Sequence, residues 1–252
     1  IIDREWPVVK AAFEAWLEPA NFDAWARYLK STPADAVFML GDVFEVWVGD
    51  DVIDDNVGLN RRFEALCADE MNAAGERLAL FFMHGNRDFL VGTTFLNACH
   101  VQDLQDPTLV NFATQKILLS HGDAGCLADT SYQEFRHMVR QASWQTAFLA
   151  KPLPERQRLA RQLRAQSEML KQDPKAVYAD VDDGWSMQWL SDTEATSLVH
   201  GHTHRPADHS FGLGSALKRY VLSDWDAADT PRAEVLRWHS TGQVERVSLI
   251  AQ

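Results

Sequence analysis

The chain has 252 residues, of which 46% are hydrophobic and 24% are charged, and its formal net charge is −12. This is an ordinary globular composition, and one large domain with room for a small subdomain fits the length better than two independent domains. The acidic balance excludes a protein that binds nucleic acid through nonspecific charge.

Cysteine content and hydropathy further limit the class of protein that the sequence can encode. Three cysteines without a C-x-x-C pair argue against a disulfide framework and a thiolate zinc site, and they indicate a reducing compartment. No apolar run reaches 18 residues, so the sequence predicts no membrane-spanning helix, and it contains no recognisable signal peptide.

The hydrophobic pattern predicts helices that alternate with short strands. Apolar residues recur at helical spacing from Val9 to Leu17, Asn21 is expected to cap a second helix, and a third covers 61–74. The predicted strands are short apolar runs at 36–40, 78–83, 116–120 and 196–199, with weaker runs at 220–223, 233–238 and 244–250. Strands that alternate with helices and end in a strand-rich tail predict a layered α/β fold.

A basic segment interrupts this acidic chain. Residues 136–175 contain nine Lys or Arg residues and three acidic residues, a local net charge of +6, beside the apolar Trp144, Phe148, Leu149 and Leu153. One interpretation is a solvated helical face. The other, favoured because the rest of the chain is acidic, is a helical insertion that holds an anionic, partly apolar ligand or rests on an anionic membrane surface.

Four of the predicted strands end at a glycine next to a hard metal ligand. These are Gly41-Asp42, Gly85-Asn86, His121-Gly122, and Gly201 followed by His202 and His204. Residues at the carboxyl ends of strands in α/β sheets face the crevice where ligands bind, and glycine lets the backbone approach a metal or phosphate. Imidazole, carboxylate and amide ligands without thiolate suit manganese, iron or zinc at a hydrolytic site.

Each of these pieces alone has an ordinary explanation, because a Gly-Asp pair is usually a turn and a lone histidine is usually structural. The string His200-Gly-His-Thr-His204 is stronger, since histidines two residues apart project to the same side of an extended chain. Asp42 could bridge two cations, and a pair of cations can clamp both oxygens of a phosphoryl transfer. Together, in this order, the four pieces predict a metal centre.

The order of these motifs resembles that of the calcineurin-like metallophosphoesterases. The longer strings resemble the UDP-2,3-diacylglucosamine hydrolase family within them: GDVFEVWVGDD at 41–51, HGNRDFL at 84–90, HGDAGCLAD at 121–129 and HGHTHRP at 200–206. The resemblance runs from about Trp6 to Pro206 and is poor beyond His209. It implies a layered α/β/β/α metallophosphoesterase sandwich, with residues 1–135 and 177–252 as the core and 136–176 as a basic helical cap.

The resemblance also implies a role for each matched residue. Asp42 would bridge two Mn²⁺ ions, Asn86, His121 and His202 would complete one site, and His204 would bind the other ion. Arg87 would contact the phosphates, where many relatives of this fold carry a histidine acid. The implied catalytic residues are Asn86, Arg87 and His202. The implied substrate contacts are Asn86, Arg87, Asp129, Ser167 and His202, and, at a spacing that departs from the family, Lys171 and Lys175.

The implied reaction is hydrolysis of the diphosphate of UDP-2,3-diacylglucosamine by a hydroxide held by the metals. The products would be UMP and 2,3-diacylglucosamine 1-phosphate, an intermediate of lipid A synthesis. A lipid substrate and an anionic inner-membrane surface are the implied partners, nucleic acid is not one, and the implied location is peripheral, on the cytoplasmic face of that membrane.

One motif of the family is missing, and alternatives stay open. The family begins with a strand that carries Asp-x-His, two ligands of the second ion, whereas Asp3 has no partner histidine. We expect that the chain lacks an upstream segment; a different N-terminus or a degraded second site are the alternatives. The alternative functions are a general nucleotide or phosphodiester phosphoesterase of the same fold and a non-catalytic scaffold.

Overall fold

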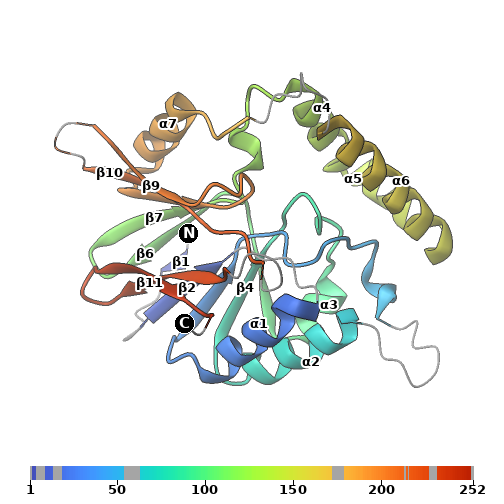
Figure 1. Cartoon of the computed structure of the whole chain (residues 1–252), viewed down its shortest axis with the longest axis horizontal. Helices are drawn as coiled ribbons and strands as arrows, with labels where there is room; N and C mark the ends of the chain where they lie inside the picture. The colour runs from blue at the N-terminus through green and yellow to red at the C-terminus, as the bar shows by residue number, and fades with distance from the viewer. Residues whose placement is uncertain are drawn as a thin grey trace.

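A computed structural model describes residues 2–3, 9–13, 19–53, 63–171, 179–212, 214, 216–226 and 232–250. Two six-stranded sheets lie face to face (Figure 1). The first has the order β1 (Ile2–Asp3), β6 (Thr108–Phe112), β7 (Gln115–Leu119), β8 (Ser197–His200), β10 (Leu217–Val221), β9 (Ala207–Phe211). The second has the order β12 (Val244–Ser248), β11 (Glu234–His239), β2 (Val9–Phe13), β3 (Ala36–Met39), β4 (Ala79–Met83), β5 (Val101–Leu104).

Helices cover the outer face of each sheet. The second sheet is covered by α1 (Pro19–Ser31), α2 (Phe63–Gly75) and α3 (Thr93–Ala98), and the first by α7 (Asp183–Thr193). Three buried apolar clusters fill the helix–sheet, sheet–sheet and sheet–helix interfaces in turn. The α/β/β/α order predicted for the fold is therefore confirmed. No helix in the described part of the chain is long and apolar enough to cross a bilayer.

The strands β3 and β4 are apolar on both faces because both faces are buried. They pair in parallel, with Phe38 opposite Phe81, and these two rings stack at 4.6 Å between the sheets. Val37 and Leu80 point the other way, into the cluster beneath the helices. This two-sided burial explains why both strands could be recognised from the sequence as continuous apolar runs.

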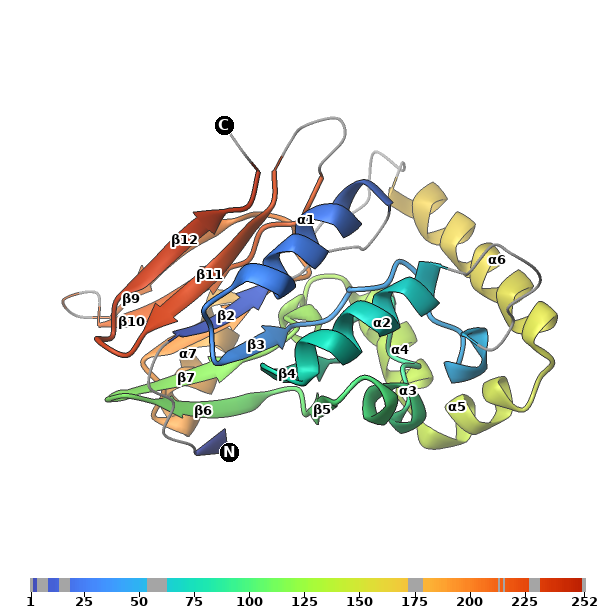
Figure 2. The ribbon, with the colours of Figure 1, turned by 90° about the horizontal axis from the view of Figure 1, so that it is seen from below.

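Three further helices extend beyond one edge of the sandwich (Figure 2): α4 (Thr130–Val139), α5 (Ala142–Leu149) and α6 (Leu153–Lys171). We call them the cap helices. Arg156 of α6 is buried and binds the carboxylate of Asp51 with both terminal nitrogens, Nη1 to Oδ1 at 2.9 Å, and it also donates to the carbonyl of Val48. These contacts hold α6 against the short 3-10 helix η1 (Asp50–Val52). The division of the chain into core and cap at residues 136 and 176 remains a prediction.

Two expectations about the beginning of the chain were wrong. Residues 9–13 form the strand β2 instead of part of a helix, because they fill the place between β3 and β11, where backbone groups of both strands need partners; residues 14–17 of that predicted helix lie outside the described residues. Asn21 does not cap a helix. It lies inside α1, and its Nδ2 donates to the carbonyl of Trp225 at 3.1 Å.

Candidate metal centre

Two loops meet where β3 and β4 end, and glycine permits their close approach. Gly41 has a φ of +89°, and a Cβ added to it would lie 2.6 Å from the Cα of Gly85. A Cβ on Gly85 would lie 2.2 Å from Oδ1 of Asp42. Both contacts are shorter than any side chain tolerates, so these two positions require glycine. The approach brings the buried Asp42 against the loop that carries Asn86 and Arg87.

Asp88 joins these two loops. Its fully buried carboxylate accepts hydrogen bonds from the backbone N–H groups of Asp42, Val43 and Phe44 in one loop and Gly85 in the other, at 2.8–3.3 Å. Asp42 completes the connection, because its Oδ1 accepts from the N–H of Arg87 at 2.8 Å. The backbone that presents Asp42 and Asn86 is thus held by side chains of the same two motifs.

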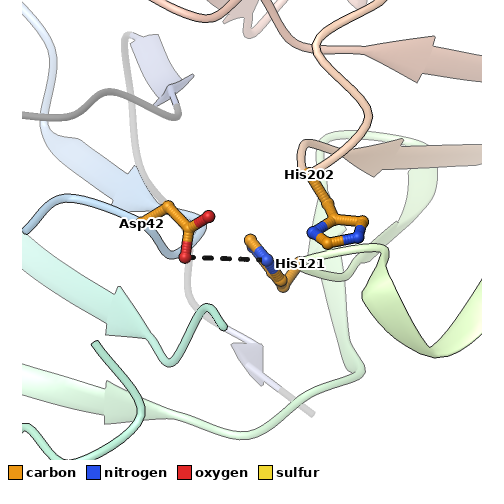
Figure 3. A group of neighbouring side chains, drawn as sticks. All are labelled: Asp42, His121 and His202. Atoms are coloured by element: carbon orange, nitrogen blue, oxygen red, sulfur yellow. Dashed lines mark ion pairs between the residues drawn. The ribbon is translucent and has the colours of Figure 1, made fainter. Parts of the chain in front are cut away.

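Four polar atoms from four strand ends converge in this region. Oδ1 of Asn86 lies 2.9 Å from Nδ1 of His202 and 3.1 Å from Nε2 of His121. Nε2 of His121 lies 3.8 Å from Oδ1 of Asp42. Figure 3 shows Asp42, His121 and His202 directed toward a shared space from three different segments. Two of these segments follow strands of the first sheet and two follow strands of the second, so the centre lies where the sheets meet.

The spacing of these atoms fits a divalent cation. Ligands that each lie about 2.1 Å from one ion are about 3.0–3.4 Å apart, close to the distances seen here. The ligand atoms of Asp42, His121 and His202 all lie within 4.8 Å of one another. Nδ1 of His121 lies 2.9 Å from the carbonyl oxygen of Leu40, so a proton on Nδ1 directs the lone pair of Nε2 toward Asn86 and Asp42, the orientation that a metal ligand requires.

The electrostatics of the histidines also fit a metal site. Desolvation of the ring, followed by repulsion from His121, lowers the pKa of His202 to about 3. His202 is therefore a neutral imidazole near neutral pH, which is the form that ligates metals. Asp42, His202 and His204 have positive φ values of 53°, 66° and 53°. Such backbone strain in residues other than glycine is typical of functional sites.

His204 and Arg87 lie at the border of this centre. Nδ1 of His204 is 3.7 Å from Oδ2 of Asp224, a residue that the motifs did not single out and that also binds Arg232. Arg87 is half-buried, and its N–H group holds Asp42 as described above. The structure thus brings Asp42, Asn86, Arg87, His121 and His202 into one site, with His204 outside the tight three-residue cluster.

The structure describes only some of the residues predicted to contact the substrate. Asp129 is the N-cap of α4, where its Oδ1 accepts from the N–H of Tyr132 at 3.0 Å. This capping bond gives the aspartate a structural role whether or not it also binds a substrate. Ser167 and Lys171 belong to α6, but their side chains lie outside the described part, and Lys175 lies wholly outside it.

The residues that support the proposed ligands could not be recognised from the sequence motifs. Asp88 was visible only as the last letter of the HGNRD motif, although an aspartate after a glycine-rich turn is a common acceptor for backbone N–H groups. Asp123 was visible only as part of HGD. Asp88 binds the N–H of Gly85 in its own motif, but its other partners, in residues 42–44, lie on another loop, and the partners of Asp123 lie on α4. No local pattern indicated these contacts.

Comparison with known proteins gives the following similarities. A UDP-2,3-diacylglucosamine hydrolase of Aromatoleum aromaticum is 40% identical over 239 residues, which cover 94% of this chain and 89% of the relative. A hydrolase of the same name from Chromobacterium violaceum is 46% identical over 191 residues, 75% of this chain and 76% of the relative. No protein-family model matches the chain. A solved archaeal phosphodiesterase covers 95% of this chain and 99% of its own at a TM-score of 0.47 and 10% identity.

The buried carboxylate of Asp88 predicts a pH-dependent stability. Burial, followed by repulsion from Asp42, raises the pKa of Asp88 from 3.8 to about 6. The folded state therefore binds this proton more tightly than the unfolded state does, and the stability it contributes is full below pH 3.8 and lost as the pH rises through about 6. With chelator present, urea unfolding should show a steeper fall in stability from pH 4 to 7 for the wild type than for Asp88→Asn. Equal slopes would contradict the assignment.

Proposed function

This chain belongs to the UDP-2,3-diacylglucosamine hydrolase family, and on that premise we propose that it hydrolyses the diphosphate of UDP-2,3-diacylglucosamine in lipid A synthesis. The observation that carries the proposal is the convergence of Asp42, Asn86, His121 and His202 in a chain that is 40% identical to a hydrolase of that name over 94% of its length. The donor set suits a hydrolytic metal centre, and the relatives supply the substrate class.

The reaction adds water across one P–O bond. The water oxygen bonds to the phosphorus next to uridine, the bond from that phosphorus to the bridging oxygen breaks, and UMP and 2,3-diacylglucosamine 1-phosphate are released. A divalent cation, when bound, activates water and stabilises negative charge on the phosphoryl oxygens. The leaving phosphate ester is a weak base, so the reaction needs no side chain that protonates it.

Arg87 contributes to this site through both its backbone and its side chain. The N–H of Arg87 fixes Asp42 at 2.8 Å, which places the root of the side chain beside the metal ligands. We assign its guanidinium to the phosphate oxygens, because a planar fork of donors matches phosphate geometry and stabilises charge that grows in the transition state.

The metal content belongs to the same proposal. Mn²⁺ is the proposed metal: Asp42, Asn86, His121 and His202 would hold one ion, and Asp42 and His204 would hold a second. Asp224, at 3.7 Å from His204, would orient that imidazole. The 252 residues contain no Asp-x-His pair, which the family resemblance assigns to the second ion.

The cap helices provide a surface that suits a lipid substrate. They expose the apolar side chains of Met138, Leu149 and Leu163 among the basic residues of the segment. We propose that this segment holds the acyl chains, that Asp129, Ser167, Lys171 and Lys175 contact the substrate's polar part, and that the same basic surface rests on the anionic inner membrane at its cytoplasmic face.

Release of UMP tests the proposed function directly. The complete gene product, incubated with Mn²⁺ and UDP-2,3-diacylglucosamine in detergent, should release UMP, and a chelator should abolish the release because the donor set requires a cation. A soluble cyclic nucleotide is the comparison substrate. Cleavage of the nucleotide alone would indicate a general phosphodiesterase, and Mn²⁺ binding without cleavage of either substrate would indicate a scaffold.

Replacement of Arg87 separates substrate chemistry from metal binding. Arg87→Ala should lower kcat about a hundredfold, the usual loss for one donor to a developing negative charge, while the affinity for Mn²⁺ stays unchanged because the N–H to Asp42 is retained. Arg87→Lys, which keeps the charge without the fork, should recover part of the rate. A loss in kcat below about tenfold, roughly 1.4 kcal/mol, would contradict the role.

Binding to lipid vesicles tests the proposed membrane contact. Arg158 and Arg161 are exposed on α6, so the double variant Arg158→Gln/Arg161→Gln should bind anionic vesicles about tenfold or more weakly. The matched control removes two exposed cations of α1, Arg27→Gln/Lys30→Gln, and should bind like the wild type. Wild-type binding that does not weaken in high salt would argue against the contact.

A further inference from the structure

Asp123 is a buried carboxylate that none of the proposed chemical steps uses. It begins the 3-10 helix η2 (Asp123–Gly125), two residues after His121, and it is fully buried. Its Oδ2 accepts a hydrogen bond from the hydroxyl of Tyr132 at 2.6 Å and lies 2.9 Å from Nε of Arg136 and 3.8 Å from Nη2 of Arg140. One carboxylate oxygen thus faces a hydroxyl donor and two guanidinium groups.

These three partners come from a single face of α4. Tyr132, Arg136 and Arg140 follow one another at intervals of four residues, and Arg140 is the C-cap of the helix. Side chains at that spacing form one stripe along a helix. All three side chains of the stripe lie within 4 Å of Asp123 Oδ2, so this carboxylate links the first cap helix to the loop that follows β7.

Two of these partners, Tyr132 and Arg140, also contact the proposed metal ligands or the backbone next to them. The ring of Tyr132 lies against the imidazole of His202, with ring centroids 5.5 Å apart and planes tilted by 31°. Arg140 donates from Nη2 to the carbonyl oxygens of His84 and Gly85 at 3.2 and 3.0 Å, and these residues directly precede Asn86. Contacts from Asp123 therefore reach two of the four converging donors without touching them directly.

The third partner, Arg136, connects Asp123 through Asp106 to the backbone on either side of His121. Nη2 of Arg136 lies 4.0 Å from Oδ2 of Asp106, and Oδ1 of Asp106 accepts from the hydroxyl of Ser120 at 2.7 Å. That hydroxyl in turn accepts from the N–H of Gly122 at 3.0 Å. The backbone on either side of His121 is thus tied to the same stripe of α4.

We propose that Asp123 is a positioning residue of the metal centre. It fixes the position of His202 through Tyr132 and that of Asn86 through Arg140, so metal affinity depends on how α4 packs against the site. The inference rests on the proposed metal centre and deepens it. Groups that orient metal ligands from outside typically change metal affinity 10- to 100-fold when they are removed. Asp123 stabilises the arrangement through charge as well as hydrogen bonding, since it lies opposite two arginines.

The main test is Asp123→Asn, which keeps an oxygen acceptor of the same size and removes the negative charge. Isothermal titration with Mn²⁺ should show a 10- to 100-fold weaker affinity for the folded variant than for the wild type. The visible absorption spectrum of the Co²⁺-loaded protein should change as well, because the spectrum reports ligand geometry and not folding. Arg140→Gln, which releases the His84 and Gly85 carbonyls, should weaken Mn²⁺ binding in the same way.

A matched control removes another carboxylate that faces a buried arginine. In Asp183→Asn the lost group lies 3.0 Å from Nη1 of Arg219. These residues belong to α7 and β10, which carry none of the proposed ligands, so Mn²⁺ affinity and the Co²⁺ spectrum should match the wild type. The double variant Asp123→Asn/Arg140→Gln should lose less affinity than the two single losses multiplied, because both act on one network.

The outcomes separate this inference from the proposed function. Unchanged Mn²⁺ affinity and an unchanged Co²⁺ spectrum in Asp123→Asn would overturn the positioning role, and so would independent losses in the double variant. If Asp123→Asn does not fold, Arg140→Gln alone decides by the same two readouts. A wild type that binds Mn²⁺ tightly without releasing UMP would overturn the proposed function only, because the affinity comparison does not depend on turnover.

Discussion

The geometry of the site depends on the carboxylate of Asp88, which binds the backbone of two loops at once. Four N–H groups that would otherwise be buried without partners converge on its two oxygens. Removing such an acceptor leaves each donor with a desolvation cost of about 1–3 kcal/mol. The positive φ of Asp42 and the close approach of Gly41 to Gly85 persist because this carboxylate holds both loops in place.

The candidate metal centre lies where the two sheets and α4 meet. Its donors follow β3 and β4 in one sheet and β7 and β8 in the other, and α4 closes on it through Asp123. No single segment could present four donors at distances of about 3–4 Å, because consecutive side chains of a strand point to opposite faces. The centre therefore forms only when both sheets and the cap helix are packed.

The agreement between sequence and structure varies with the range of the interactions involved. The strands at 36–40, 78–83, 116–120 and 196–199 were predicted because their buried residues form short apolar runs, and β3, β4, β7 and β8 lie there. The helix predicted from the apolar pattern between Val9 and Leu17 was wrong at residues 9–13. These residues pair with β3 and β11 as strand β2, and this pairing outweighs their helical pattern. The predicted capping role of Asn21 was wrong for a similar reason, because its side-chain amide binds the carbonyl of the distant Trp225.

By itself the sequence determined the layered fold class and the residues able to ligate a metal, because each motif is a local pattern of a buried strand, a glycine and a polar side chain. The tertiary structure alone decided which of those side chains meet. It placed Asn86 between His121 and His202 and His204 beside Asp224. It also brought Asp88, Asp123 and Arg140 into contact with the segments that carry the ligands. The contacts of Asn86, His204 and Arg140 join residues 20 to 116 positions apart, and their distances follow from how sheets and helices pack, which no local pattern encodes.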